Sequence, residues 1–154
     1  MMFRLFLFAA ALPIALTVAL HQVVPGMTVP MTAAPFAIGP MEHVNRTVIF
    51  GVDGPAGLLL MGVVLAVVIV TLREATGGLR RLDALALGLF TGGAISNGGE
   101  SFVRNSVIDW LWLSPDGEWA MVVNSADLAL TTGGALMALR VAAIAAGRVA
   151  LDTR

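Results

Sequence analysis

The chain has 154 residues, of which 58% are hydrophobic and only 12% are charged, and its formal net charge is −1. Soluble domains carry about a quarter charged residues, so this composition excludes a water-soluble globule of this size and predicts a single membrane domain. The lack of cysteine excludes disulfides, a cysteine nucleophile and thiolate metal sites, and the net charge gives no electrostatic basis for binding nucleic acid.

Four apolar stretches are candidates for membrane-spanning helices, each of which needs about 20 mostly apolar residues. The first runs over residues 3–24 and is interrupted only by Arg4 and Pro13. A cleaved secretory signal is the alternative, but its apolar core is only about 7–15 residues long, so we favour a retained helix. The remaining predicted spans are residues 57–72, 82–96 and 125–146. The second and third spans are short and are expected to extend beyond these limits.

Two segments between the spans have a different character. Residues 25–56 are rich in Pro, Gly, Thr and Met and contain a β-like stretch at 47–50, which predicts a small sheet or extended loop on the membrane. Residues 97–124 contain all three tryptophans of the chain. Because tryptophan prefers the headgroup level, we interpret this second segment as an interfacial turn or short amphipathic helix.

The arginines predict the orientation, because cytoplasmic loops carry an excess of basic residues. Alternating spans place most of the arginines on one side together with both chain ends, which predicts cytoplasmic termini. The acids are biased to the opposite side, so an acidic functional site is expected at the outer face. The predicted fold is an all-α membrane protein with four transmembrane helices and a small extended or β-like periplasmic segment. The arginines assigned to the inner side are Arg4, Arg73, Arg80, Arg81, Arg140, Arg148 and Arg154.

Two aspartates, Asp109 and Asp127, lie close to predicted helix ends in apolar surroundings. An ionisable group in a membrane segment is costly and indicates function. Two facing carboxyls can share one proton, so that one acts as general base and the other as general acid on an amide. The alternatives are that Asp127 caps the fourth helix and that Asp109 is a hydrated interfacial acid. Spacing alone does not show that the two acids meet.

A polar, glycine-rich stretch covers residues 92–100 and lacks the Gly-Lys-Ser/Thr ending of a phosphate-binding loop. It has two interpretations: close helix packing through small residues, or a polar pocket into which Asn97 and Glu100 point together with the aspartates. The two histidines, His21 and His43, are too isolated to indicate a metal site, and His21 is interpreted as a polar residue at the membrane boundary.

Four sequence blocks resemble the lipoprotein signal peptidase (signal peptidase II) family, in the family's order. Residues 45–51 read Asn-Arg-Thr-Val-Ile-Phe-Gly and resemble Asn-x-Gly-x-Ala-Phe-Gly. Residues 92–100 read Gly-Gly-Ala-Ile-Ser-Asn-Gly-Gly-Glu and resemble Gly-Gly-Ala-x-Gly-Asn-x-x-Asp. Residues 107–110 and 123–127 read Val-Ile-Asp-Trp and Val-Asn-Ser-Ala-Asp and resemble Val-x-Asp-Phe and Phe-Asn-x-Ala-Asp.

The resemblance implies an intramembrane aspartyl endopeptidase of the bacterial inner membrane that cuts before a diacylglyceryl-modified cysteine. It implies that Asp109 and Asp127 are the catalytic pair, without a metal or other cofactor. The implied partners are lipidated prolipoproteins, membrane lipid and globomycin-type inhibitors. The residues expected to support the pair or the substrate are Asn45, Asn97, Glu100, Arg104 and Asn124.

The chain departs from the family pattern at positions that bear on the substrate. The family's Asp-Arg reads Glu100-Ser101 here, and Arg104 is the candidate substitute for the missing arginine. The family's Asp-Gln-x-x-Lys reads His-Gln-Val-Val-Pro at residues 21–25. These changes leave open a non-proteolytic relative that binds lipidated peptides or lipid. A small transporter or channel subunit is a third alternative, and the two aspartates favour the protease over both.

Overall fold

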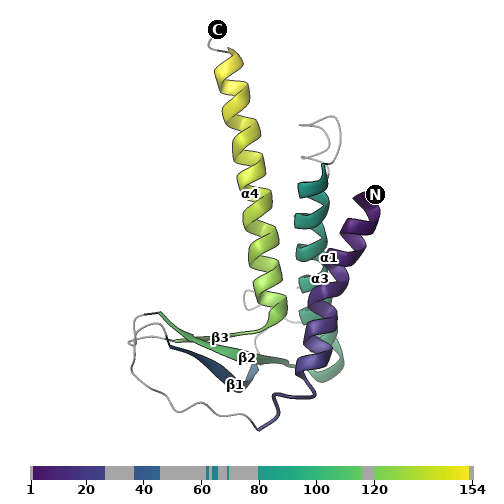
Figure 1. Ribbon diagram of the computed structural model, residues 1–154, viewed down its shortest axis with the longest axis vertical. Helices are drawn as coiled ribbons and strands as arrows, with labels where there is room; N and C mark the ends of the chain where they lie inside the picture. Colours follow the sequence, from purple (N-terminus) through teal and green to yellow (C-terminus); the bar gives the residue numbers. More distant parts are fainter. Residues whose placement is uncertain are drawn as a thin grey trace.

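The computed structural model describes residues 2–26, 37–45, 80–115 and 120–152, together with positions 62, 64, 65 and 69. Among these residues, three long helices run beside one another and a small sheet lies at one end of them (Figure 1). Both chain ends lie toward the opposite end of the helices (Figure 1). The helices are α1 (Met2–Leu20), α3 (Arg81–Arg104) and α4 (Ser125–Asp152), and the strands are β1 (Ala37–Asn45), β2 (Val107–Ser114) and β3 (Met121–Val123).

Two of the described helices are long and apolar enough to cross a membrane, over Met2–Leu20 and Ser125–Gly147. Both expose large apolar side chains: Phe3 is 70% exposed and Leu139 is 68% exposed. Such surfaces suit lipid, where no water is available and a helix satisfies its own backbone. The protein is therefore a membrane protein built from helices and a small antiparallel sheet.

The predicted count of four spanning helices is not confirmed. The second predicted span, residues 57–72, falls almost entirely outside the described residues, although positions 62, 64, 65 and 69 are helical. Leu65 and Ile69 pack against the apolar core around Leu87 and Met137. The third predicted span is part of α3, which is longer than expected and carries charged residues toward both of its ends.

Helix α3 is central and packs against both α1 and α4. Small residues allow this close approach, as is common between membrane helices. A Cβ added to Gly92 would collide with the backbone of Ala10 on α1, and one added to Gly93 would lie 2.5 Å from the carbonyl oxygen of Ala126 on α4. The glycine pair therefore serves the close packing of three helices.

This packing predicts that Gly92→Ala destabilises the protein strongly. The new methyl group meets backbone atoms of α1 that have no freedom to rotate away, so α1 must shift; overpacking of this kind costs about 1–3 kcal/mol or more. Gly99→Ala is the matched control, because its Cβ would meet nothing within 4 Å. Thermal unfolding of the two variants in detergent compares them directly, and equal melting temperatures would contradict the packing argument.

Buried polar contacts also tie the helices together. Close to the sheet, the Ser96 hydroxyl donates to Oγ1 of Thr17 at 2.8 Å, and Thr17 contacts the Ser125 hydroxyl at 2.9 Å. Toward the other end, Arg140 Nε donates to Oδ1 of the buried Asp83 at 3.3 Å. Asp83 Oδ2 also accepts the backbone N–H of Arg80 at 2.8 Å, which caps the first turn of α3. Polar contacts thus join all three helices close to the sheet and join α3 to α4 at the other end.

The sheet is antiparallel with the strand order β1-β2-β3. Asn105 ends α3 in the left-handed conformation, with φ 52° and its N–H bonded to the carbonyl of Ser101, and the chain then turns into β2. The register pairs His43 with Asp109 and Asn45 with Val107. Strand β3 leads through Asn124 directly into α4, so the sheet joins the ends of α3 and α4.

The sheet corrects two predictions. The expected turn or short amphipathic helix within residues 97–124 is wrong over the described part, because α3 continues to Arg104 and is followed by β2 and β3, while the interfacial location stays a prediction. An all-α class is correspondingly too narrow, since these strands add to the strand found in the first outer segment. That strand is β1, at residues 37–45, whereas the β-like stretch at 47–50 lies outside the described residues.

Candidate active site

The two aspartates lie where the sheet meets α4. Asp109 is on β2 and is 2% exposed, and Asp127 is in the first turn of α4 and is half-buried. The pairing of β2 with β3 brings the start of α4 back beside Asp109, because Leu111 lies opposite Val123. Local strand pairing thus places the two residues together although they lie on different elements.

Each of the four carboxylate oxygens of the pair accepts a hydrogen bond. On Asp109, Oδ1 accepts from Nδ2 of Asn124 at 2.8 Å and Oδ2 accepts from Nδ2 of Asn45 at 3.1 Å. On Asp127, Oδ1 accepts from Nδ2 of Asn97 at 2.7 Å and Oδ2 accepts from the backbone N–H of Asn124 at 3.0 Å. The predicted residues Asn45, Asn97 and Asn124 therefore belong to one network with both acids, drawn from β1, α3 and the residue before α4.

Asn124 connects the two acids directly. It is 1% exposed and precedes α4 as the N-cap residue, and its Oδ1 accepts the N–H of Asp127 at 2.9 Å. Because Asp127 accepts the N–H of Asn124 in return, the two residues form a reciprocal capping box. The amide Nδ2 of Asn124 remains available for Asp109. Capping of α4 by Asp127, considered above as an alternative to pairing, therefore coexists with the link to Asp109.

The environment of Asp109 favours the neutral carboxyl. Burial, followed by the negative charge of Asp127, raises the pKa of Asp109 from its usual range to about 6. Hydrogen bonds from Asn45 and Asn124 and the nearby His43 oppose this rise, because they stabilise the ionised form. The negative charge of Asp127 thus acts directly on the Asp109 carboxyl, as expected where two carboxyls lie close together.

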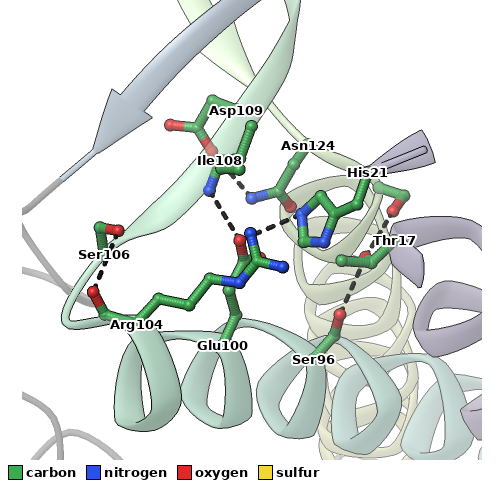
Figure 2. A network of polar contacts seen from close by, with 10 residues as sticks. Thr17, His21, Ser96, Glu100, Arg104, Ser106, Ile108, Asp109 and Asn124 are labelled. Atoms are coloured by element: carbon green, nitrogen blue, oxygen red, sulfur yellow. Dashed lines mark hydrogen bonds and ion pairs between the residues drawn. The ribbon is translucent and has the colours of Figure 1, made fainter. Parts of the chain in front are cut away.

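Glu100 and Arg104, the other two predicted residues, lie on α3, across the first residues of β2 from the Asp109 side chain (Figure 2). Glu100 Oε1 accepts the N–H of Ile108 at 3.2 Å and lies 3.0 Å from Nε2 of His21. Figure 2 shows the guanidinium of Arg104 turned toward Glu100 and His21. These two predicted residues thus form a second cluster, which joins the first through the Ile108–Asp109 backbone.

Sequence reasoning missed the place of His21. It was interpreted as a boundary residue, but its side chain is only 12% exposed and contacts Glu100. Burial, followed by the charge of Arg104, lowers the pKa of His21 below its usual range. The available signal was the motif departure itself, since His21 and Glu100 both stand at positions where the family pattern has Asp.

An apolar cavity of about 290 Å³ lies beside the candidate site. Its walls include Leu16 and Leu20 of α1, Leu128 of α4 and the indole of Trp110. Ser125, next to the bridging Asn124, also lines it. The cavity is suited to hydrocarbon rather than to a polar ligand. Within the described part of the chain, no group of three or more His, Asp and Glu residues is arranged to hold a metal ion.

Comparison with known proteins identifies relatives of this arrangement. The sequence model of a family described as signal peptidase (SPase) II, Peptidase_A8, matches residues 10–143. Two solved structures, each titled as a bacterial membrane enzyme determined by the in meso method, share the fold. The first, at 2.3 Å resolution, has a TM-score of 0.63 and 15% identity and covers 88% of this chain and 85% of its own. The second, at 1.9 Å, has a TM-score of 0.59 and 16% identity and covers 90% of each chain. No curated protein sequence matches.

Proposed function

The chain belongs to the signal peptidase II family, and from this we propose that it is an aspartic endopeptidase that removes signal peptides from diacylglyceryl-modified prolipoproteins. In this proposal Asp109 and Asp127 are the catalytic pair. The single observation that carries it is the bridge formed by Asn124, whose side chain contacts both residues. A lone capping aspartate or a hydrated interfacial acid would need no such link to a second buried carboxyl.

The proposed reaction is hydrolysis of the peptide bond before the lipidated cysteine. Asp127, as carboxylate, takes a proton from water while the water oxygen bonds to the carbonyl carbon. Asp109, whose pKa is raised by burial, donates its proton to the carbonyl oxygen from the neutral form. The tetrahedral intermediate then collapses, the C–N bond breaks and the amino group of the cysteine leaves with a proton returned from Asp127. The carbonyl re-forms and returns a proton to Asp109, so the pair ends as it began.

The supporting residues have separate tasks in this mechanism. Asn124 and Asn45 hold the Asp109 carboxyl, and Asn97 orients Asp127 from α3. The cavity between α1 and α4, beside Trp110, has the size and lining to take an acyl chain of the substrate. A lipidated peptide bound there would present its backbone toward the sheet, where the two acids lie.

We place this site at the outer face of the bacterial inner membrane, with cytoplasmic termini. Two features support the orientation: both chain ends lie away from the sheet (Figure 1), and Arg4, Arg81 and Arg140 lie in the halves of their helices that are remote from it. The lipid anchor of a prolipoprotein would then enter sideways from the membrane.

The test is incubation of the purified protein with a lipidated prolipoprotein, with and without globomycin. We expect a product that begins with the lipidated cysteine, identified by mass spectrometry, and loss of that product when globomycin is present. Binding of the lipidated peptide without any cleavage would instead identify a non-proteolytic relative. Cleavage of unlipidated precursors at the same rate would contradict the substrate class.

The raised pKa of Asp109 predicts the pH dependence of cleavage. The mechanism needs the neutral carboxyl, so kcat/KM should fall as the pH rises above an apparent pKa of about 6 in the free enzyme. Asn45→Leu removes a hydrogen bond that stabilises the ionised form, which raises the pKa, so this limb should move to higher pH. Val44→Leu, at an exposed neighbour on β1, is the control. An Asn45→Leu limb that stays in place or moves to lower pH would contradict the assignment of Asp109 as the proton donor.

A further inference from the structure

His21 connects the first helix to the strand that carries Asp109. It lies in the turn that follows α1, and its own backbone N–H donates to the carbonyl of Thr17 at 3.0 Å, so its position is fixed by the helix. Its Nε2 atom lies 3.0 Å from Oε1 of Glu100, and the two side chains are only 12% and 5% exposed. The contact is close in distance but is not aligned as a hydrogen bond, so it is chiefly an electrostatic and packing contact.

Glu100 connects His21 to the backbone of β2. The same oxygen, Oε1, accepts the backbone N–H of Ile108, the residue directly before Asp109. Among the described residues, Oε2 of Glu100 has no hydrogen-bond partner. The close polar contacts of the carboxylate with these residues are therefore made through Oε1, between His21 on one side and the β2 backbone on the other (Figure 2).

We propose that His21 is a positioning residue for peptide hydrolysis: through Glu100 it fixes the backbone of β2 at Ile108 and thereby the placement of the Asp109 carboxyl. The kinetic part of this proposal rests on the proposed function. Asp109 is held by Asn124, by Asn45 and by the backbone of its own strand. His21 acts on that backbone from the end of α1, the helix that also lines the apolar cavity. Seating of a substrate chain against α1 is in this way coupled to the geometry of the acid.

The polar groups around His21 explain why removal of its imidazole should disturb Glu100 and β2. The groups that face this region are Glu100 and Arg104 from α3, with Asp109 and His43 on the strands beyond. Burial raises the pKa of Glu100, and without the imidazole this buried polar side chain loses one of its two fixed contacts, which is costly for a buried polar group. The carboxylate would rotate toward Arg104 and release the Ile108 N–H.

Two substitutions separate contact from bulk. His21→Leu keeps an apolar side chain but removes the polar atom that faces Glu100, and His21→Gln keeps an amide nitrogen at a similar reach. We expect His21→Leu to lower kcat about tenfold with KM changed by less than about twofold, because the reacting group is displaced. His21→Gln should recover most of the activity. Val23→Leu, which places the same leucine at an exposed residue nearby, should leave kcat unaltered.

A double-mutant cycle tests whether His21 acts through Glu100. In a Glu100→Gln background, His21→Leu should have an effect of less than about threefold, since the residue through which it acts is already altered. Independent, multiplicative losses in the double variant would overturn the proposed route. Full activity of His21→Leu, or failure of His21→Gln to recover any of the loss, would overturn the positioning role.

Amide hydrogen exchange tests the same contact without catalysis. The Ile108 amide should exchange about tenfold faster in His21→Leu than in the native protein or in His21→Gln, while amides of α4 serve as an internal reference. Unchanged protection at Ile108 would overturn the proposal whether or not the protein cleaves any substrate. A protein that shows the exchange effect but cuts no lipidated prolipoprotein would instead contradict the proposed function alone.

Discussion

Asp109→Asn and Asp127→Asn should each reduce cleavage of a lipidated prolipoprotein by about 10³-fold or more, with the protein still folded in the membrane. An amide neither takes a proton from water nor donates one as a carboxylic acid, so either change removes one half of the acid–base pair. The capping of α4 survives Asp127→Asn, because an amide oxygen can still accept the N–H of Asn124. Loss of activity should therefore not be loss of fold.

Glu42→Gln is the matched control for these two variants. Glu42 is another acid of the sheet region, and its Oε2 accepts the N–H of Gly26 at 2.7 Å in an exposed position. The same acid-to-amide change there should leave cleavage within about twofold of the native rate, as expected for an exposed hydrogen bond. Mass spectrometry of the products and thermal unfolding measure both properties. Retained processing by either aspartate variant would remove that residue from the catalytic pair.

The second large effect is expected at Asn124, where two substitutions distinguish capping from bridging. Asn124→Leu removes the cap and the donor to Asp109 together, so we expect both a lower melting temperature and a loss of activity of about 10²-fold or more. The lost cap alone is worth about 1–2 kcal/mol. Asn124→Asp should retain the cap, because aspartate is as good an N-cap as asparagine.

Asn124→Asp should nevertheless abolish most of the cleavage. Aspartate has no amide hydrogen for Oδ1 of Asp109, and it adds a third carboxylate next to Asp109 and Asp127. A melting temperature above that of Asn124→Leu, because the cap is retained, with cleavage reduced about 10²-fold or more, is the expected signature. Asn105→Asp, the same change at an exposed residue after α3, is the control. An active Asn124→Asp variant would show that the bridge to Asp109 is dispensable.

Composition was sufficient to predict a membrane protein, and ordered motif blocks were sufficient to predict the family, which the match over residues 10–143 confirms. The sheet was harder to predict. In β2 the burial alternates only in part, with Val107, Asp109, Trp112 and Ser114 buried, while most of the strand is apolar on both faces. A nearly continuous apolar run hides the period of two that marks a strand.

The tryptophans show the same difficulty. Their headgroup-level placement stays a prediction, but their roles within the fold were not predicted: Trp112 is 5% exposed within the sheet and Trp110 lines the apolar cavity. Residue type indicates a preferred environment, whereas the strand register decides which side chain faces it. The motif departures single out His21 and Glu100, but the contact between them depends on how α1 packs against α3, and no spacing in the chain specifies that packing.

The reciprocal capping at the start of α4 has a consequence for how proteolytic activity could be lost during evolution. Asp127 begins a helix as well as taking part in the proposed chemistry, so a descendant with no need for proteolysis would still gain stability by keeping it. Asp109 has no such second task in a helix end, and its buried charge is costly once the reaction is no longer selected. Among relatives of this chain, those without proteolytic activity should therefore be recognised by the residue at position 109. An aspartate at position 127 says little about whether a relative hydrolyses peptides.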